Sequence, residues 1–458
     1  MKTSISPWIR QLNHERPVRR LGSDLSADVV IIGAGIAGIS TAFFALKKTH
    51  RSVVMLEKYK LAHGATGHNA GQVVTYFERA FRDIVADFGL DQAIEGQRAV
   101  ESAWDLLELM YQEAGLDIPF SRFSGHAGFS SKSQVLNELE DNYLKAKGGI
   151  YIEPVYISEN VDWLKEIPKK FKGLYQKEKH QVILDRLQTD NTSYLAVHSA
   201  AKGCINSALF CEGVLKYLER KYPERFALYE HATVNKIVLR RDHALIDATE
   251  HTVRAKNVVL CTNGFENLTI LNDHGLDIDT EFHHLVEGKV GYMSGYLEAY
   301  DKPPAAISYY SDVVSTIKDP YFYLTRRMYE HEDKKQLNLI CVGGPDISLE
   351  DRKEYIHNYE FPEEAQGEID AFLKNTYDTD PGHKIDYQFT WHGLMGYTPN
   401  GIRLIGSEPK NPTLLYNLGC NGVGILPSIY GGLRLSSILS GKKTEKSIFD
   451  PVDHKKAN

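Results

Sequence analysis

The spacing of apolar residues changes from strand-like to helix-like and back again within residues 27–57. Asp28 to Ile32 is rich in β-branched side chains, which predicts a buried strand. Ile36 to Lys48 repeats small and apolar residues at helical spacing, and Ser52 to Leu56 is a second apolar run. We therefore expect a strand–helix–strand unit, which is a building block of parallel sheets.

Similar patterns predict elements along the rest of the chain. Helical periodicity extends over 79–113 and 205–224, and a strand runs into a helix over 128–143. The last segment, from 414 onward, is expected to form a strand, a Gly-rich turn and a helix. Short alternating or apolar runs predict further strands at 232–239, 244–248, 253–260, 289–296, 320–328 and 338–343.

Composition narrows the class of protein. The 458 residues include 42% hydrophobic and 25% charged residues, which is typical of soluble globular proteins. The net charge of -7 and the lack of a basic stripe argue against nucleic acid, so we expect a small-molecule partner. Five scattered cysteines indicate a reducing compartment, and no stretch reaches the roughly 18–20 apolar residues that cross a bilayer. We therefore expect a cytoplasmic protein without a membrane span.

The pattern Gly33-x-Gly35-x-x-Gly38 lies between the first strand and its helix. In this context the glycines permit a tight turn, a close approach of backbone N–H groups to a pyrophosphate, and close helix–strand packing. Glu57 ends the second strand, where an acid binds the ribose hydroxyls of an adenosine. The alternative is a glycine-rich turn in another kind of α/β protein, which would not need strand, glycines, helix, strand and acid in this order.

The sequence GATGHNAGQ at 64–72 distinguishes between NAD and FAD, which share an ADP moiety. A nicotinamide enzyme normally continues with more βαβ units, whereas this loop follows the second strand directly. Its glycines would bring peptide N–H groups against a flavin dinucleotide, with Thr66 and Asn69 as side-chain donors. A plain surface loop is the alternative.

Three later segments favour FAD. Val234 lies in the expected strand at 232–239, where a flavoprotein strand can bind an adenine through its backbone, and VVLCTNG at 258–264 ends in a small polar turn suited to a pyrophosphate. Gly419-x-Asn421-Gly422-x-Gly424 precedes a helix, whose dipole would stabilise charge on the flavin pyrimidine.

On these motifs the chain resembles the FAD-dependent amine and amino-acid oxidoreductases of the D-amino-acid oxidase superfamily, and most closely the bacterial branch of gamma-glutamylputrescine oxidase. The resemblance spans most of residues 8–445. It also includes SGHAGF, KIDYQFTWHGLMGYTPNGIRLIG and LLYNLGCNGVGILPSIYGG. The expected FAD contacts are Gly33, Gly35, Ile36, Ala37, Gly38, Glu57, Lys58, Gly64, Ala65, Thr66, His68, Asn69, Ala70, Gly71, Gln72, Val234, Thr262, Asn263, Gly264, Gly419, Asn421, Gly422, Val423, Gly424 and Ile425.

The resemblance and the patterns together predict the fold class and the domains. We expect an α/β protein, α+β overall, in which a Rossmann-like FAD-binding domain with a βαβ unit carries an inserted antiparallel-sheet substrate domain. Residues 268–385 suggest the insertion because they are richer in Tyr, His and charge. The expected division is a leader at 1–26, an FAD-binding domain at 27–78, 196–267 and 386–445, a substrate or cap domain at 79–195 and 268–385, and a tail at 446–458.

His68 departs from the related branch, which often has an arginine there. Dimethylglycine and sarcosine dehydrogenases, which look similar around this loop, place there a histidine that bonds covalently to the flavin. The resemblance therefore raises a covalent link through His68 as a hypothesis. We expect non-covalent FAD instead, with the imidazole forming a hydrogen bond to the flavin or the loop.

Candidate substrate residues lie in two segments. Tyr321 to Arg327 matches a family strand that lines the substrate side, where Tyr323 lies, and Arg326 or Arg327 is a candidate clamp for a carboxylate. Solvated arginines are the alternative. The candidate aromatic wall and proton carrier are Trp391, His392 and Tyr397, for which core packing is the alternative, and Lys289 is a candidate for assisting the reaction with oxygen.

These residues predict an FAD-dependent oxidase or dehydrogenase of a primary or secondary amine or amino acid. Hydride transfer to flavin N5 would give an imine that water hydrolyses. The alternatives are a 2-hydroxy-acid or polyol-phosphate dehydrogenase and a flavin-binding subunit without catalysis. We expect no metal centre, and the sequence leaves open whether oxygen or another compound accepts the electrons, as well as the oligomeric state.

Overall fold

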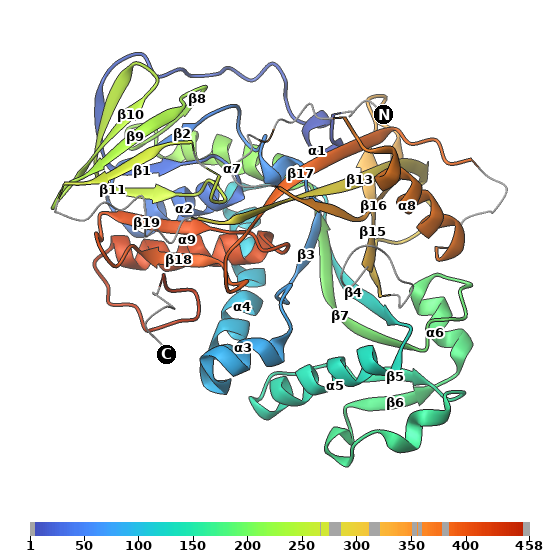
Figure 1. Ribbon diagram of the computed structural model, residues 1–458. Helices are drawn as coiled ribbons and strands as arrows, with labels where there is room; N and C mark the ends of the chain where they lie inside the picture. Colours follow the sequence, from blue (N-terminus) through green and yellow to red (C-terminus); the bar gives the residue numbers. More distant parts are fainter. Residues whose placement is uncertain are drawn as a thin grey trace.

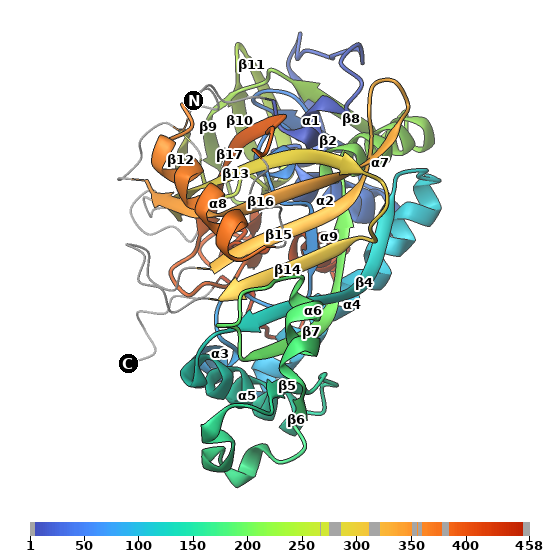
Figure 2. The same ribbon diagram turned by 90° about the vertical axis from the view of Figure 1, so that its right-hand side faces the viewer.

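The chain forms two sheets with helices around them in a computed structural model, which describes residues 5–265, 267–273, 285–310, 321–349, 355, 360–377 and 384–451. One sheet lies beside α2 (Ile36–Lys48), α7 (Ser207–Lys221) and α9 (Ile425–Leu439), and the other extends away from it toward α6 (His180–Leu187) and α8 (Glu363–Asn375) (Figures 1 and 2). Within the described residues no helix combines the length and the apolar character needed to cross a membrane.

The first sheet is built around the expected strand–helix–strand unit. Strands β1 and β2 pair in parallel, and β1 also pairs in parallel with β11. An antiparallel β9–β10–β11 meander continues the sheet. In sheet order, the strands are β12 (Thr269–Asn272), β9 (Val234–Leu239), β10 (Ala244–Ala248), β11 (His251–Leu260), β1 (Leu25–Ile32), β2 (Val53–Glu57) and β8 (Phe226–Glu230), with β19 (Leu414–Leu418) on β11 and β18 (Leu404–Ser407) on β19.

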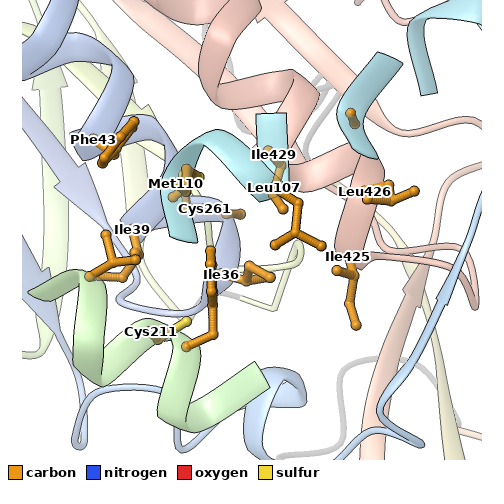
Figure 3. Packing of buried hydrophobic residues seen from close by; sticks show 14 of the residues in the cluster. Ile36, Ile39, Phe43, Leu107, Met110, Cys211, Cys261, Ile425, Leu426 and Ile429 are labelled. Atoms are coloured by element: carbon orange, nitrogen blue, oxygen red, sulfur yellow. The ribbon is translucent and has the colours of Figure 1, made fainter. Parts of the chain in front are cut away.

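Helices with small and apolar faces pack on this sheet. Helices α2 and α9 cross closely because Gly432 has no side chain, and a Cβ there would lie 2.6 Å from the backbone of Ser40. Figure 3 shows side chains of several helices meeting in this core, among them Ile39, Leu107 and Ile429. The helices are α2 (Ile36–Lys48), α3 (Phe81–Phe88), α4 (Leu90–Ala114), α7 (Ser207–Lys221) and α9 (Ile425–Leu439), with the short α1 (Pro7–Arg10) beside α7.

The second sheet is mixed, because β14 pairs in parallel with β4 and β5 pairs in parallel with β6, whereas its other pairings are antiparallel. The expectation of an antiparallel sheet is therefore correct for most of it but not for these two pairs. In sheet order, the strands are β17 (Phe389–Tyr397), β13 (Glu287–Ala299), β16 (Gln336–Ser348), β15 (Tyr321–Glu330), β14 (Ala305–Tyr310), β4 (Phe120–Phe129), β7 (Ala196–Ile205), β5 (Val155–Ser158) and β6 (Tyr175–Glu178), with β3 (Gln72–Val74) on β7.

Further helices cover parts of the second sheet. Helix α5 begins with a capping box, in which Ser131 and Gln134 satisfy each other's backbone N–H groups. Helix α8 packs on β16 and β13. These helices are α5 (Lys132–Lys147), α6 (His180–Leu187) and α8 (Glu363–Asn375), with the short 3-10 helices η1 (Ala65–Gly67), η2 (Asp162–Glu166) and η3 (Lys169–Phe171).

Sheet membership differs from the expected domain division in several segments. Strands β3, β7 and β17 lie in segments assigned to the FAD-binding domain but pair in the second sheet, and β12, assigned to the cap, pairs with β9 in the first sheet. Helices α3 and α4, assigned to the cap, pack near the first sheet, where α4 contacts α7 and α9. The reason is that strand pairing joins segments far apart in sequence, and the pattern within one segment does not encode its partner.

Candidate active site

One large cavity, of about 2610 Å³, lies between the two sheets. The ends of β1 and β2, the GATGHNAGQ loop and the turn before α9 line one part of it, and residues of β4, β7, β14 and β15 line another. Typical ligand pockets measure roughly 300–1,000 Å³, so this cavity has room for a large cofactor and a second molecule.

The glycine turn after β1 is folded as the motif predicts. Gly33 has a positive φ of 102°, and a Cβ there would lie 2.6 Å from the carbonyl oxygen of Cys261. At Gly35 a Cβ would lie 2.8 Å from Oγ1 of Thr66, which accepts a hydrogen bond of 3.0 Å from the N–H of Ile36. A side chain at either glycine would therefore push apart segments that border the cavity.

Glu57 lies at the end of β2 and lines the same cavity. Its carboxylate accepts hydrogen bonds from the N–H groups of Ala34, at 2.7 Å, and Tyr59, at 2.9 Å. Burial raises the pKa of Glu57, and these two hydrogen bonds oppose that rise because they favour the charged form. Each carboxylate oxygen has a second lone pair with which it can accept a ligand hydroxyl.

Arg403 is a buried cation at the glycine turn before α9, and sequence reasoning missed it. Its guanidinium donates to the side-chain and backbone oxygens of Asn417, at 2.7 and 2.8 Å, and to the carbonyl of Gly419. All these acceptors are neutral, and burial lowers the pKa of Arg403 to about 10. Because Arg403 lines the cavity, its charge is placed to attract an anion there. The signal in the sequence was a charged residue directly before the apolar run of β18.

The N-terminal segment packs against the GATGHNAGQ loop through Trp8. Trp8 is fully buried, and its Nε1–H donates to the carbonyl of Asn69 at 2.5 Å. A Cβ at Gly71, where φ is 70°, would lie 2.7 Å from the Trp8 ring. Nδ1 of His68 lies 2.9 Å from the carbonyl of Gly64, and because a carbonyl oxygen only accepts, Nδ1 is the donor in that hydrogen bond.

Most of the expected cofactor residues line the cavity. The exceptions are Gly38, Gly71, Gly419 and Asn421. Gly38 and Gly71 instead allow close packing of the backbone, and Asn421 accepts hydrogen bonds from the N–H and hydroxyl of Thr398. The residues that line it are Gly33, Gly35, Ile36, Ala37, Glu57, Lys58, Gly64, Ala65, Thr66, His68, Asn69, Ala70, Gln72, Val234, Thr262, Asn263, Gly264, Gly422, Val423, Gly424 and Ile425.

The candidate substrate arginines do not line this cavity. Neighbouring residues of a strand point to opposite faces, so Arg326 and Arg327 diverge. Arg326 donates to the carbonyl of Pro303, to Gln188 and to the hydroxyl of Tyr377, while the Arg327 guanidinium lies over the Trp8 ring at 4.8 Å. Both side chains are therefore buried in protein contacts and lie outside the cavity wall.

Of the three candidate residues on β17, only one lines the cavity. Tyr397, like Tyr323 of β15, lines the cavity, whereas Trp391 and His392 do not. Trp391 is fully buried, and its ring meets Trp8 edge-on. His392 is 1% exposed, and its Nδ1 lies 2.6 Å from the hydroxyl of Tyr355, which itself lines the cavity.

The second sheet contributes polar residues that the sequence did not indicate. Lys202 of β7, Ser308 of β14 and Tyr76 after β3 line the cavity, and the Lys202 ammonium donates to Ser308 Oγ at 3.2 Å. Glu78 and Tyr397 border Gly422, where a Cβ would lie 3.1 Å from Cγ of Glu78 and 3.0 Å from the Tyr397 hydroxyl. The one signal in the sequence was a lysine within the otherwise small and apolar run of β7.

Comparison with known proteins identifies the family. The model of the DAO family of FAD-dependent oxidoreductases matches residues 28–437. The chain belongs to the DAO family. Its matched segments cover half or less of the length of its curated relatives. Gamma-glutamylputrescine oxidoreductase of Escherichia coli is 33% identical over 88 residues, which are 19% of this chain and 20% of that protein. Dimethylglycine dehydrogenase of Rattus norvegicus is 49% identical over 51 residues, 11% of this chain and 6% of that protein.

Solved structures confirm the fold class. Glycine oxidase from Geobacillus kaustophilus has a TM-score of 0.67 and 16% identity, over 94% of this chain and 99% of that one. DAO-family enzymes use FAD, which supplies a flavin ring that accepts a hydride at N5. The residues present fit this cofactor, because the turn at Gly33 and Gly35 leaves no room for side chains and buried Arg403 adds positive charge. The described residues hold no cluster of three or more His, Cys, Asp or Glu side chains suited to a metal ion.

Proposed function

We propose that this DAO-family oxidoreductase oxidises the CH–NH bond of a primary or secondary amine or amino acid. The observation that carries the proposal is the continuity of the cavity: the wall that includes Gly33, Glu57 and Gly422 runs without a break to Glu78 and Lys202. A substrate can therefore lie between the second sheet and a flavin held along the first. The imine formed by loss of hydride is then hydrolysed by water.

The names of the relatives support an amine as the substrate. Gamma-glutamylputrescine oxidoreductase and dimethylglycine dehydrogenase are named for compounds with an oxidisable C–N bond, and the fold is that of a glycine oxidase. In our proposal the chain's own residues bind and orient the amine. Tyr323, Tyr355 and Tyr397 form part of the wall, and tyrosine rings favour a cationic amine.

Amine oxidation and alcohol oxidation differ in whether the protein must supply a general base. An amine reacts once it has lost its ammonium proton, whereas an alcohol needs a general base to remove the hydroxyl proton at the moment of hydride loss. His392, the residue that we considered for that role, bonds to Tyr355 and does not line the cavity. This favours amine oxidation over oxidation of a 2-hydroxy acid or polyol phosphate.

For the cofactor we propose non-covalent FAD, with Glu57 at the adenosine ribose and Val234 near the adenine. The Gly33–Gly35 turn and Arg403 lie toward the pyrophosphate, and Gly422 to Ile425 lie toward the flavin pyrimidine. His68 is proposed to form a hydrogen bond within its loop, as its Nδ1 does with Gly64.

Anaerobic mixing tests the reaction class directly. The purified holoenzyme is mixed with a panel of primary amines, secondary amines, amino acids and 2-hydroxy acids, and flavin absorbance near 450 nm is followed. We expect an amine or amino acid to bleach the flavin. Bleaching by hydroxy acids alone, or by no compound, would overturn the proposal.

A further inference from the structure

Lys202 is a buried cation in the middle of β7, and its side chain lines the cavity although it is only 2% exposed. Its ammonium donates to Ser308 Oγ at 3.2 Å and to the backbone carbonyl of His126 at 3.4 Å. An ammonium has three N–H donors, so these two acceptors leave one for another molecule. The Tyr76 ring, with its centre 5.7 Å from Nζ, covers another side of the group.

No described carboxylate lies within ion-pair distance of Lys202, although Glu78 interacts with it electrostatically at longer range. Burial of a cation without an adjacent anion costs free energy, because the charge gives up its hydration. An anionic ligand that binds the ammonium would offset this cost. Burial lowers the pKa of Lys202 to about 8, so the group still carries its proton at neutral pH.

Four other cations that line the cavity lie beside a carboxylate. Arg79 lies 2.6 Å from Asp87, Arg82 lies 3.1 Å from Asp141 and Arg122 lies 3.7 Å from Glu108. Lys289 lies 3.9 Å from Asp346. Lys202 differs from these four because its hydrogen-bond partners are neutral.

The Lys202 ammonium is linked to two hydroxyl groups, directly to that of Ser308 and through it to that of Tyr76. Ser308 Oγ interacts with the Tyr76 hydroxyl as well as with Lys202, so the three groups form one connected set. An ammonium with adjacent hydroxyl donors suits an anionic oxygen ligand, and charge-assisted hydrogen bonds of this kind are the stronger ones. The candidate arginines of β15 are directed elsewhere and leave this role open.

We propose that Lys202, with Ser308 and Tyr76, binds a carboxylate of the substrate, so that the substrate class is an amine that also carries a carboxylate. This inference rests on the proposed function only for the statement that the substrate is an amine; the carboxylate site is argued separately. Glu78, which lines the same cavity beside Gly422 and Tyr397, then carries the charge that suits the amine end of such a molecule.

Acetate is the probe for the carboxylate half, and its binding requires no turnover. Acetate is titrated into the flavin-loaded holoenzyme at constant ionic strength and followed by the flavin spectrum and by calorimetry. We expect saturable binding that weakens at least tenfold in Lys202→Met and about two- to fivefold in Ser308→Ala. Lys216→Met, at an exposed lysine of α7, serves as the matched control and leaves acetate affinity unchanged.

Three results would overturn the inference. Equal acetate affinity in Lys202→Met and the unaltered protein would show that Lys202 does not bind the carboxylate. This conclusion would hold even if the reduced flavin of the variant reacted slowly with oxygen. Tighter binding of inorganic phosphate than of acetate would point to a phosphate ester. Lys202→Met could also lose acetate binding together with flavin and show a lowered Tm, while Ser308→Ala binds acetate normally. That combination would indicate that Lys202 has only a structural role. If no amine bleaches the flavin while acetate still binds through Lys202, the proposed function fails and this inference stands.

Discussion

The hydroxyl of Thr66 accepts a hydrogen bond of 3.0 Å from the backbone N–H of Ile36, the first residue of α2. The GATGHNAGQ loop is thereby joined to the helix N-terminus that borders the cofactor cavity. A Cβ at Gly35 would lie 2.8 Å from the same hydroxyl oxygen, so the contact also depends on a glycine.

We therefore expect Thr66→Ala to destabilise the fold by about 1 kcal/mol, as loss of a helix N-terminal acceptor does, and to weaken FAD binding several-fold. Thr66→Ser keeps the hydroxyl and is the matched control. Thermal unfolding and titration of apoprotein with FAD measure both effects. Equal FAD affinity in the alanine and serine variants would show that the hydrogen bond between Thr66 and Ile36 does not affect FAD binding.

The hydrogen bond from His68 to Gly64 leads to a prediction about how FAD is attached. We expect acid precipitation of the holoenzyme to release all flavin into the supernatant, because the imidazole acts within its loop. His68→Asn is expected to keep FAD bound with a modest loss of affinity. Yellow colour that stays with the precipitate, and disappears in His68→Asn, would establish a covalent bond through this residue.

Lys202 gives a prediction about stability that is opposite in sign to its effect on binding. A lysine whose pKa falls from 10.5 to about 8 on folding destabilises the folded state by about 3 kcal/mol at pH 7. Lys202→Met removes this cost at similar volume, so we expect its free energy of unfolding to rise by about 1–3 kcal/mol. Chemical denaturation of both proteins without acetate measures the difference.

The pH dependence of that stability follows from the same residue. Between pH 8 and 10.5 the unfolded chain holds the Lys202 proton and the folded chain has lost it, so the folded form gains stability as pH rises. The groups near Lys202 in this window include Glu78, Cys204, Tyr76 and His126, and burial raises the pKa of Cys204 to about 12. Lys202→Met should lack the rise. A parallel pH profile in both proteins would mean that Lys202 does not titrate there.

His392 provides a test of the reaction class. Its Nδ1 lies 2.6 Å from the Tyr355 hydroxyl, and the side chain is 1% exposed. For amine oxidation we expect Tyr355→Phe and His392→Gln to lower the rate of flavin reduction less than about tenfold, because no general base is needed. A loss of roughly 10²–10⁴-fold, the usual contribution of a general base, would instead favour an alcohol substrate. Rapid-mixing absorbance with each variant measures the rate.

Local patterns predicted the elements that border the proposed cofactor site. The run from Asp28 to Glu57 became β1, α2 and β2, because its period, its glycines and its acid are all set by neighbouring residues. The glycine turn before α9 was predictable for the same reason.

The substrate side could not be predicted in this way. Lys202 and Ser308 lie 106 positions apart, and the pairing of β14 with β4 and of β4 with β7 brings them together. Arg326 and Arg327 looked suited to a carboxylate, yet their direction depends on which buried partners each face of β15 meets. Such choices are made by the packing of whole sheets, and the sequence of one strand does not contain them.

The most direct test of the account is the anaerobic reduction of the flavin by an amine that is followed to completion. We expect one equivalent of an amine that carries a carboxylate to bleach one equivalent of flavin and to yield the carbonyl product of imine hydrolysis. Bleaching by a 2-hydroxy acid with no reduction by any amine would contradict it.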